Sequence, residues 1–305
     1  MPIKIPGGLP AAQILESEHI FVMEENRAQT QDIRPLRIAI LNLMPTKIAT
    51  ETQLIRLLSN TPLQVELTLL GTETYRATHI SEEHMESFYQ CFSDVKHKKF
   101  DGLIITGAPV ENLEFTDVAY WDELCAILDW SRKHVYSTLH ICWAAQAGLY
   151  HHYGIQKHAL PEKMFGIFEH EAVCPRHPLL RGFDEVFLAP HSRHTTVYES
   201  DIKACPQLDI LARSERAGVY IVADKNARQF YITGHAEYDH DTLSLEYFRD
   251  TLRGLSIDIP YNYFPNNDTS LQPRNVWRGH ANLLFSNWLN YFVYQRTPYD
   301  IDAIE

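Results

Sequence analysis

Hydrophobic positions in the first half of the chain follow two alternating patterns. Short, nearly continuous apolar runs are typical of buried strands, and they occupy residues 37–44, 63–71, 100–109 and 136–143. Between these runs, apolar residues recur every three to four positions, which predicts amphipathic helices over 50–60, 82–95, 118–134 and 144–154. Strands that alternate with helices in this way predict an α/β fold, with a mostly parallel sheet and helices on both faces.

The second half of the chain has a different pattern. We expect short strands joined by turns at 168–173, 185–192, 208–214, 219–226 and 229–238, with a hairpin loop at 224–228. We interpret these strands as extra sheet layers on the same core. Two helices, 241–254 and 280–295, are expected after them, separated by a loop rich in Pro and Asn.

No internal repeat or low-complexity tract divides the main part of the chain. Residues 1–34 mix Pro, Gly and acidic positions, which predicts an N-terminal surface segment, and residues 35–300 are interpreted as one elaborated domain.

Composition and charge exclude several classes of protein. The chain has 305 residues, of which 45% are hydrophobic and 22% charged, as in ordinary globular proteins. Its formal net charge of −12 repels phosphate backbones and anionic lipid, so we expect neither a nucleic-acid partner nor a membrane partner. The first residues lack the pattern of a signal peptide, and no apolar run is long enough for a membrane span. We therefore expect a cytoplasmic protein.

One cysteine stands out among the five in the sequence. The five are widely spaced without a CxxC pair, which indicates neither a disulfide framework nor a zinc site. Cys91 and Cys125 fall among apolar positions of predicted helices, so we expect them in the core. Cys142 follows a predicted strand and directly precedes a helix that begins with small residues. A sharp turn there would place the thiol at a helix N-terminus, where the dipole and backbone N–H groups favour a thiolate and an oxyanion. A small buried hydrophobic role for Cys142 is the alternative.

A candidate base follows another predicted strand. His235 and Glu237 are separated by one residue, so in an extended chain both side chains point to the same side. The carboxylate could then hold one imidazole nitrogen while the other faces the cysteine. The alternative is an exposed histidine and glutamate with no common role.

The other histidines do not show the spacing of a metal site such as HExxH, so we predict no catalytic metal. We expect surface or supporting roles for His151, His152, His170, His177, His191, His194 and His240. The sequence contains neither a GxGxxG nor a P-loop motif, which argues against dinucleotide or ATP chemistry.

Several long segments carry a resemblance to a known family. They are IRPLRIAILNLMPTK, LIITGAPVE, STLHICWAAQAGLYHHYG, FLAPHSRHT, YITGHAEYD and HANLLFSNWLNYFVYQ. Together they resemble the homoserine O-acyltransferases of methionine biosynthesis, and the similarity spans residues 2–300. The resemblance implies a class I glutamine amidotransferase-like fold, a flavodoxin-like three-layer sandwich, with added C-terminal helices.

The resemblance also implies a mechanism. In a ping-pong reaction, a cysteine takes an acyl group from acyl-CoA and passes it to the γ-hydroxyl of L-homoserine. Cys142 would be the thioester nucleophile, His235 the general base and Glu237 its orienting partner. Backbone N–H groups near Trp143 and in the turn that contains Ala108 would meet the oxyanion. An imidazole with a near-neutral pKa would then deprotonate first the thiol and then the alcohol.

The resemblance assigns substrate binding to Lys163, Ser192 and Arg249. A guanidinium at Arg249 suits the carboxylate of homoserine. The alternative for Arg249 is a surface cation paired with Glu246 or Asp250. Lys47 follows another predicted strand and is expected near the acyl donor.

One position is expected to select the acyl donor. Glutamate at position 111 is associated in the family with acetyl transfer and a small residue with succinyl transfer, because a carboxylate would fill the acyl pocket and repel succinate. We therefore expect acetyl-CoA as co-substrate, with no separate cofactor. The alternative is that Glu111 points to solvent. The family also suggests a homodimer.

Three other functions stay open at this point. The same chemistry could use succinyl-CoA, or the same triad could hydrolyse glutamine together with a partner subunit. A noncatalytic sensor with Cys142 as a redox-sensitive thiol is the third.

Overall fold

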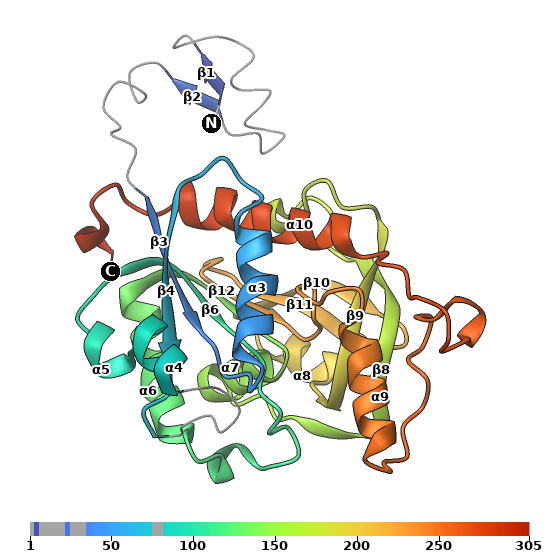
Figure 1. Ribbon diagram of the computed structural model, residues 1–305. Helices are drawn as coiled ribbons and strands as arrows, with labels where there is room; N and C mark the ends of the chain where they lie inside the picture. Colours follow the sequence, from blue (N-terminus) through green and yellow to red (C-terminus); the bar gives the residue numbers. More distant parts are fainter. Residues whose placement is uncertain (1–2, 6–21, 25–34, 75–81, 305) are drawn as a thin grey trace.

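The computed structural model describes residues 3–5, 22–24, 35–74 and 82–304, and it is built around one ten-stranded sheet (Figure 1). The strands are ordered β5-β4-β3-β6-β7-β12-β11-β10-β8-β9. Their bounds are β3 Leu36–Leu41, β4 Val65–Gly71, β5 Tyr89–Cys91, β6 Phe100–Ile105, β7 Val135–Ile141, β8 His158–Ala172, β9 Val186–Thr196, β10 Leu208–Ser214, β11 Gly218–Asp224 and β12 Gln229–Ile232. Neighbours from β5 to β12 pair in parallel, and those from β12 to β9 pair antiparallel. The prediction of a mostly parallel α/β fold is confirmed.

Helices cover both faces of the parallel part of the sheet. Side chains of β3 point alternately to the two faces, so each face has its own apolar cluster for helices to cover. Ile38 and Ile40 pack in one apolar cluster with Leu54 of α3 and Leu284 of α10. Ala39 packs in a second cluster with residues of α6 on the opposite face. The helices are α3 Lys47–Leu58, α6 Trp121–His134, α7 Trp143–Tyr153, α8 Glu199–Ala204, α9 Thr242–Leu252 and α10 Arg278–Asn287. A π-helix, Trp288–Tyr294, continues α10.

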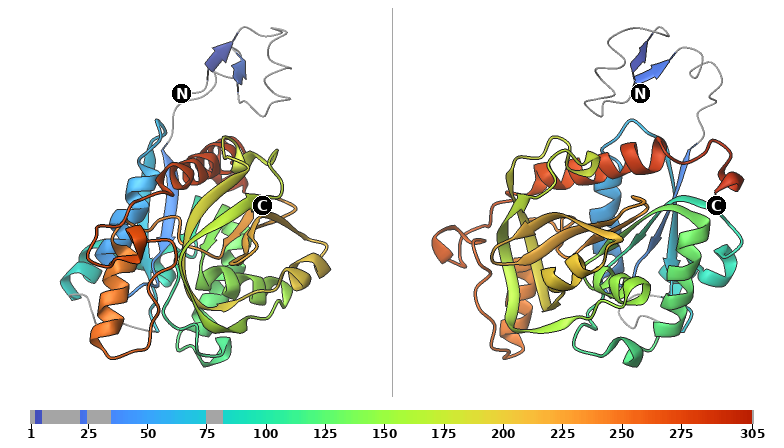
Figure 2. Two further views of the ribbon diagram at one scale, coloured as in Figure 1. Left: turned by 90° about the vertical axis from the view of Figure 1, so that its right-hand side faces the viewer. Right: turned by 180° about the vertical axis from the view of Figure 1, so that it is seen from behind.

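The antiparallel strands do not form extra layers, so this part of the prediction is wrong. They extend the same sheet, because β11 pairs with β12 and the ladder continues through β10 and β8 to β9. This part of the sheet curls, as the view from behind in Figure 2 shows. The curl brings β9 back beside the chain that follows β12, where the N–H of His235 donates to the carbonyl of Pro190 over 2.9 Å. An edge strand thereby reaches the carboxyl end of the parallel part.

The helix predicted over 82–95 is also wrong. The structure has α4 Glu82–Phe88, the short strand β5 and α5 Phe92–Val95 in its place. Leu69 of β4 pairs with Tyr89, whose hydroxyl accepts from Asn42 over 2.9 Å. Pairing with a sheet edge thus outweighs the local helical pattern, and Cys91 is exposed instead of buried in the core.

Among the described residues, no helix combines the length and the apolar character needed to cross a membrane. Two short strands, β1 Ile3–Ile5 and β2 Val22–Glu24, pair in parallel. The rest of the predicted surface segment 1–34 lies outside the described residues, so that boundary stays a prediction.

Candidate active site

Cys142 stands on a sharp turn between β7 and α7. Its backbone has φ 53° and ψ −115°, a region that residues other than Gly rarely adopt. The N–H of Cys142 donates to the carbonyl of Ile232 over 2.6 Å, which fixes the turn to the end of β12. Helix α7 begins at the next residue, Trp143, and N–H groups in the first turn of a helix have no partner within the helix. The thiol therefore lies beside the first turn of α7 and the positive end of its helix dipole.

The turn after β6 lies against both Cys142 and the base. A Cβ atom built on Gly107 would be 3.3 Å from the Cβ of Cys142 and 3.6 Å from Cε1 of His235. Glycine at this position therefore allows a close approach of the backbone to the thiol and the imidazole. The following residue, Ala108, is buried. This turn can offer backbone donors to an oxyanion that forms on a substrate of Cys142.

His235 is held between Cys142 and Glu237. Its Nδ1–H donates to Oε1 of Glu237 over 2.7 Å, and both side chains are at most 7% exposed. The ring of Tyr238 stacks on the imidazole at 4.1 Å between centroids. With Nδ1 bonded to the carboxylate, Nε2 is left for the nucleophile, as the H-x-E spacing predicts.

The charge state of His235 differs from the sequence-based expectation. Burial alone would lower its pKa, but the adjacent Cys142 and Glu237 act in the opposite direction and raise the pKa well above the ordinary value. The near-neutral pKa expected from the sequence is therefore wrong for the free protein. The direction of this shift favours the imidazolium form of His235 beside Cys142 and Glu237.

The predicted substrate-binding residues meet at Glu246 of α9. Lys163 of β8 donates from Nζ to Oε1 of Glu246 over 2.6 Å, and the hydroxyl of Ser192 donates to the same oxygen over 2.7 Å. Ser192 lies inside β9, which continues beyond the predicted strand 185–192 as far as Thr196. From the sequence, Glu246 was expected only as a possible partner of Arg249. The spacing of three residues on a helix was the available signal, because it puts both side chains on one face.

Arg249 lies at the solvent side of this cluster. Its Nε donates to Oδ1 of Asp250 over 2.7 Å, and its Nη2 lies 3.8 Å from Oε1 of Glu246. The side chain is 51% exposed. The pairing with acidic neighbours expected as the alternative is therefore present, yet it leaves part of the guanidinium open to a ligand.

Tyr238 connects the cluster with the catalytic candidates. Burial raises its pKa well above the ordinary value, and the charges of Glu246, Glu237, Cys142 and Glu111 act in the same direction. A single partly buried ring is thus within electrostatic reach of all four groups. Tyr238 was not among the residues predicted from the sequence, although it directly follows Glu237.

Glu111 does not point away into solvent. Its Oε2 accepts from the backbone N–H of His194 over 2.7 Å, and Lys157 Nζ donates to its carbonyl over 2.6 Å. The carboxylate is therefore fixed against β9, two residues along from Ser192. Its charge also reaches Tyr238, so Glu111 belongs to the surroundings of the site.

Lys47 lies at the carboxyl end of β3. Its ammonium donates to the carbonyl of Asn42, and burial lowers its pKa to about 8 although Glu51 acts in the opposite direction. The N–H of Leu43 donates to Oγ1 of Thr106 over 2.7 Å, which ties this loop to the residue before Gly107. Lys47, the first residue of α3, and the Gly107 turn thus lie at the same edge of the sheet.

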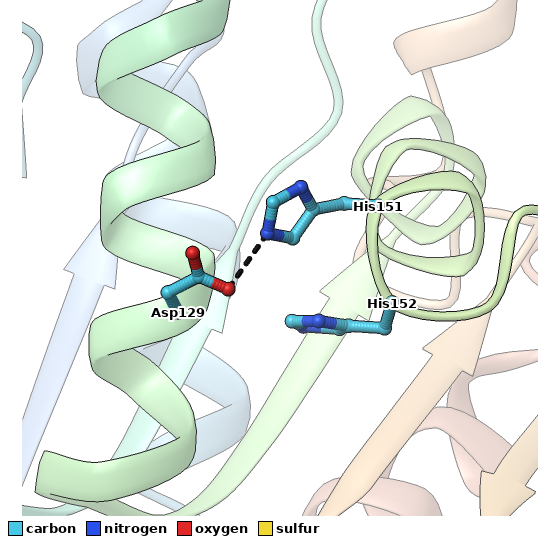
Figure 3. Close-up of side chains that lie close together, drawn as sticks. All are labelled: Asp129, His151 and His152. Atoms are coloured by element: carbon cyan, nitrogen blue, oxygen red, sulfur yellow. Dashed lines mark hydrogen bonds and ion pairs between the residues drawn. The ribbon is translucent and has the colours of Figure 1, made fainter.

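A group of potential metal ligands lies away from this edge, between α6 and α7 (Figure 3). Asp129, His151 and His152 offer ligand atoms within 4.8 Å of one another, and His151 already bonds Asp129 over 2.8 Å. Burial lowers the pKa of His152 to about 3, with a further contribution from the positive charge of Arg132. A cation held there would face the same charge, and His151 and His152 lie in the last turn of α7, at the opposite end of that helix from Cys142.

The fold and the site define a class of protein. A solved glutamine amidotransferase from Thermotoga maritima has a similar fold, with a TM-score of 0.56 and 12% identity over 84% of this chain and 97% of that chain. A family model described as homoserine O-succinyltransferase matches residues 2–299, and the chain belongs to that family. The resemblance found in the sequence is confirmed.

Curated relatives narrow the comparison further. A protein of Acetivibrio thermocellus named homoserine O-acetyltransferase is 60% identical over 305 residues, which are all of both chains. A protein of Brevibacillus brevis with the same name is 60% identical over 302 residues, 99% of each chain. The family description and the relatives' names agree on O-acylation of homoserine and differ in the acyl donor.

Proposed function

We propose that this chain transfers an acetyl group from acetyl-CoA to the γ-hydroxyl of L-homoserine through a thioester on Cys142. The observation that carries the proposal is the placement of His235 between Cys142 and Glu237 at the edge where the Lys163–Ser192–Glu246 cluster also lies. The reaction needs acetyl-CoA only as co-substrate. A cytoplasmic location and a homodimer stay predictions.

The first half-reaction starts with Cys142 as a thiolate and His235 as an imidazolium. The thiolate of Cys142 attacks the thioester carbonyl of acetyl-CoA, and the oxyanion accepts from the N–H groups of Trp143 and the Gly107 turn. When the tetrahedral intermediate collapses, the C–S bond to CoA breaks. The CoA thiolate takes the proton of the His235 imidazolium and leaves as the thiol.

Acetylation of Cys142 changes the charge state of His235. The acetylated sulfur of Cys142 carries no charge, so the leading cause that raises the pKa of His235 is removed. The imidazole is then neutral and oriented by Glu237, as a general base requires. It takes the proton of the homoserine hydroxyl while the oxygen attacks the thioester, and Cys142 leaves as the thiolate.

The Glu246 cluster supplies matching charges for the acceptor. Homoserine carries an ammonium and a carboxylate. Glu246 can accept from the ammonium, while Lys163 and the exposed part of Arg249 can donate to the carboxylate. The hydroxyl of Ser192 donates to Glu246 and holds the carboxylate of Glu246 in place.

We infer the acyl donor, acetyl-CoA, from the position of Glu111. Its carboxylate is fixed by the His194 N–H and lies within electrostatic reach of Tyr238, which stacks on His235. A succinyl group would bring a second carboxylate toward it, and like charges repel most strongly in a partly buried pocket.

The test measures CoA release with acetyl-CoA and with succinyl-CoA, each with L-homoserine. The variants are Cys142→Ala and Glu111→Ala, with Glu215→Ala, an exposed turn residue, as matched control. We expect the wild type to prefer acetyl-CoA, and Glu111→Ala to raise the succinyl-to-acetyl ratio of kcat/KM at least about tenfold. Turnover unchanged in Cys142→Ala would refute the thioester route, and a wild-type preference for succinyl-CoA would refute the role of Glu111.

A further inference from the structure

Arg193 is a buried cation at the centre of the curled strands. It lies in β9 and is fully buried. Its donors go to neutral acceptors: Nη1 to the carbonyl of Thr195 over 2.7 Å, Nη2 to the carbonyl of Ala217, and Nε to Nδ1 of His191 over 3.3 Å. Across the described part of the chain, no carboxylate lies within ion-pair distance of this guanidinium. A buried charge without a counter-charge is costly, so the anion that balances it has to be found further away.

Two acidic groups on other elements act on this guanidinium. Burial lowers the pKa of Arg193 to about 10, whereas Cys142 at the start of α7 and Glu111 in the loop after β6 act in the opposite direction. Glu111 is held by the N–H of His194. Cys142 is buried whereas Glu111 is only half-buried, so a thiolate on Cys142 would be the more deeply buried of the two anions.

The histidines beside Arg193 do not compete for this role. His191 accepts from Arg193 at Nδ1, so its proton is on Nε2, which lies 2.9 Å from Nε2 of His170. Burial lowers the pKa of His191 well below its ordinary value, and the charges of Arg193, His170 and His235 act in the same direction. Burial also lowers the pKa of His170 to about 3. Both rings are therefore neutral, and the guanidinium is the fixed positive charge behind the site.

A chain of hydrogen bonds also connects Arg193 to the turn of Cys142. The carbonyl of Thr195, which accepts from Arg193, also accepts from Nε2 of Gln146 over 3.2 Å, and the hydroxyl of Thr195 donates to Oε1 of Gln146 over 2.7 Å. Gln146 belongs to α7, and its N–H donates to the carbonyl of Cys142 over 3.3 Å. These side chains hold the first turn of α7 against β9.

We propose that Arg193 is a positioning residue of the nucleophile: its buried charge favours the thiolate of Cys142, and its contacts through Thr195 and Gln146 fix the turn that carries the thiol. The inference rests on the proposed function. Arg193 belongs to the antiparallel strand β9, and Cys142 follows the parallel strand β7. The antiparallel part of the sheet would therefore act directly on the nucleophile.

The experiment follows the alkylation of Cys142 by iodoacetamide as a function of pH, read by peptide mass spectrometry on the full chain. The variants are Arg193→Gln and Arg193→Met, which are neutral, and Arg193→Lys, which keeps the charge. Cys91 is exposed and serves as reference thiol within each sample. We expect both neutral variants to raise the pH midpoint of Cys142 alkylation by about one unit, with Cys91 unchanged and Arg193→Lys close to wild type.

Several results would overturn the inference. A midpoint that stays within about 0.3 pH units of wild type in a folded neutral variant would leave Arg193 with a packing role only. If both neutral variants failed to fold by circular dichroism while Arg193→Lys restored the fold, the charge would be required for the fold as a whole and its assignment to the nucleophile would be refuted. A midpoint raised equally in Arg193→Lys would show that charge is not the cause. These outcomes do not depend on acyl transfer, so failure of the inference is measured by alkylation and failure of the proposed function by unchanged turnover in Cys142→Ala.

Discussion

The parallel and the antiparallel parts of the sheet supply different halves of the site. The parallel part provides Cys142 on its turn and the adjacent Gly107 loop, both at strand ends. The antiparallel part provides Lys163 and Ser192 from within long strands, which meet Glu246 of a separate helix. Reactive groups at strand ends depend on local chain geometry, whereas the binding cluster exists only because the sheet curls.

The first prediction removes the contribution of the parallel part. Cys142→Ala should reduce CoA release by at least about 10³-fold, since the remaining groups have no nucleophile to activate. Initial rates with acetyl-CoA and L-homoserine measure the effect. Cys91→Ala is the control, because Cys91 is exposed on the edge strand β5, and it should retain wild-type rates. An equal loss in both variants would contradict the assignment.

The second prediction removes the contribution of the antiparallel part. Glu246→Gln keeps the shape of the side chain but loses the charge that Lys163 and Ser192 contact. We expect kcat/KM for L-homoserine to fall about 100-fold, as for loss of a charged hydrogen-bonded partner, while acetylation of Cys142 by acetyl-CoA continues. Steady-state kinetics and a single-turnover assay without homoserine separate the two steps. Equal loss in both steps would mean that Glu246 does not act on the acceptor.

A third prediction concerns the junction between the two parts. A Cβ on Gly234 would lie 2.7 Å from the carbonyl of Pro190 and 2.9 Å from Cε1 of His191, so Gly234→Ala must push β9 away. We expect a loss of about 1–3 kcal/mol in the free energy of unfolding, together with lower activity. Denaturant unfolding and rate assays measure both. Gly279→Ala, on α10 where nothing lies within 4 Å, should be neutral or slightly stabilising. Wild-type stability in Gly234→Ala would show that the junction is loose.

The smallest expected effect is a shift in pH dependence. Glu237 raises the pKa of His235, so Glu237→Gln should lower that pKa. The acyl-enzyme needs neutral His235, and the acid limb of kcat should therefore move to lower pH, by roughly one unit. Profiles of kcat against pH for the two proteins provide the test. A shift to higher pH would contradict the assigned pairing.

Sequence patterns predicted what is local in this molecule. The turn at Cys142 and the spacing of His235 and Glu237 each depend on a few adjacent residues, and the structure has both arrangements. Patterns failed where distant segments decide the outcome. Residues 89–91 read as helix but pair with the sheet edge. The joining of Ser192 to Glu246 depends on how β9 curls against α9, which no local spacing encodes.

The charge of the site was predicted least well. A near-neutral pKa was expected for the imidazole of His235, as part of the mechanism that the family resemblance implies. In the structure, a buried ring lies between two acidic groups, and the coupling among them changes its protonation. Such coupling depends on distances across the fold. It extends from Cys142 as far as Arg193 of β9.

The central claim is that Cys142 carries the acetyl group between the two substrates. Intact-protein mass spectrometry after mixing with acetyl-CoA alone tests it most directly. We predict the added mass of one acetyl group, located on Cys142 by peptide mapping, and its disappearance when L-homoserine is added. A protein that stays unmodified with acetyl-CoA alone, yet forms O-acetylhomoserine when both substrates are present, would contradict the account.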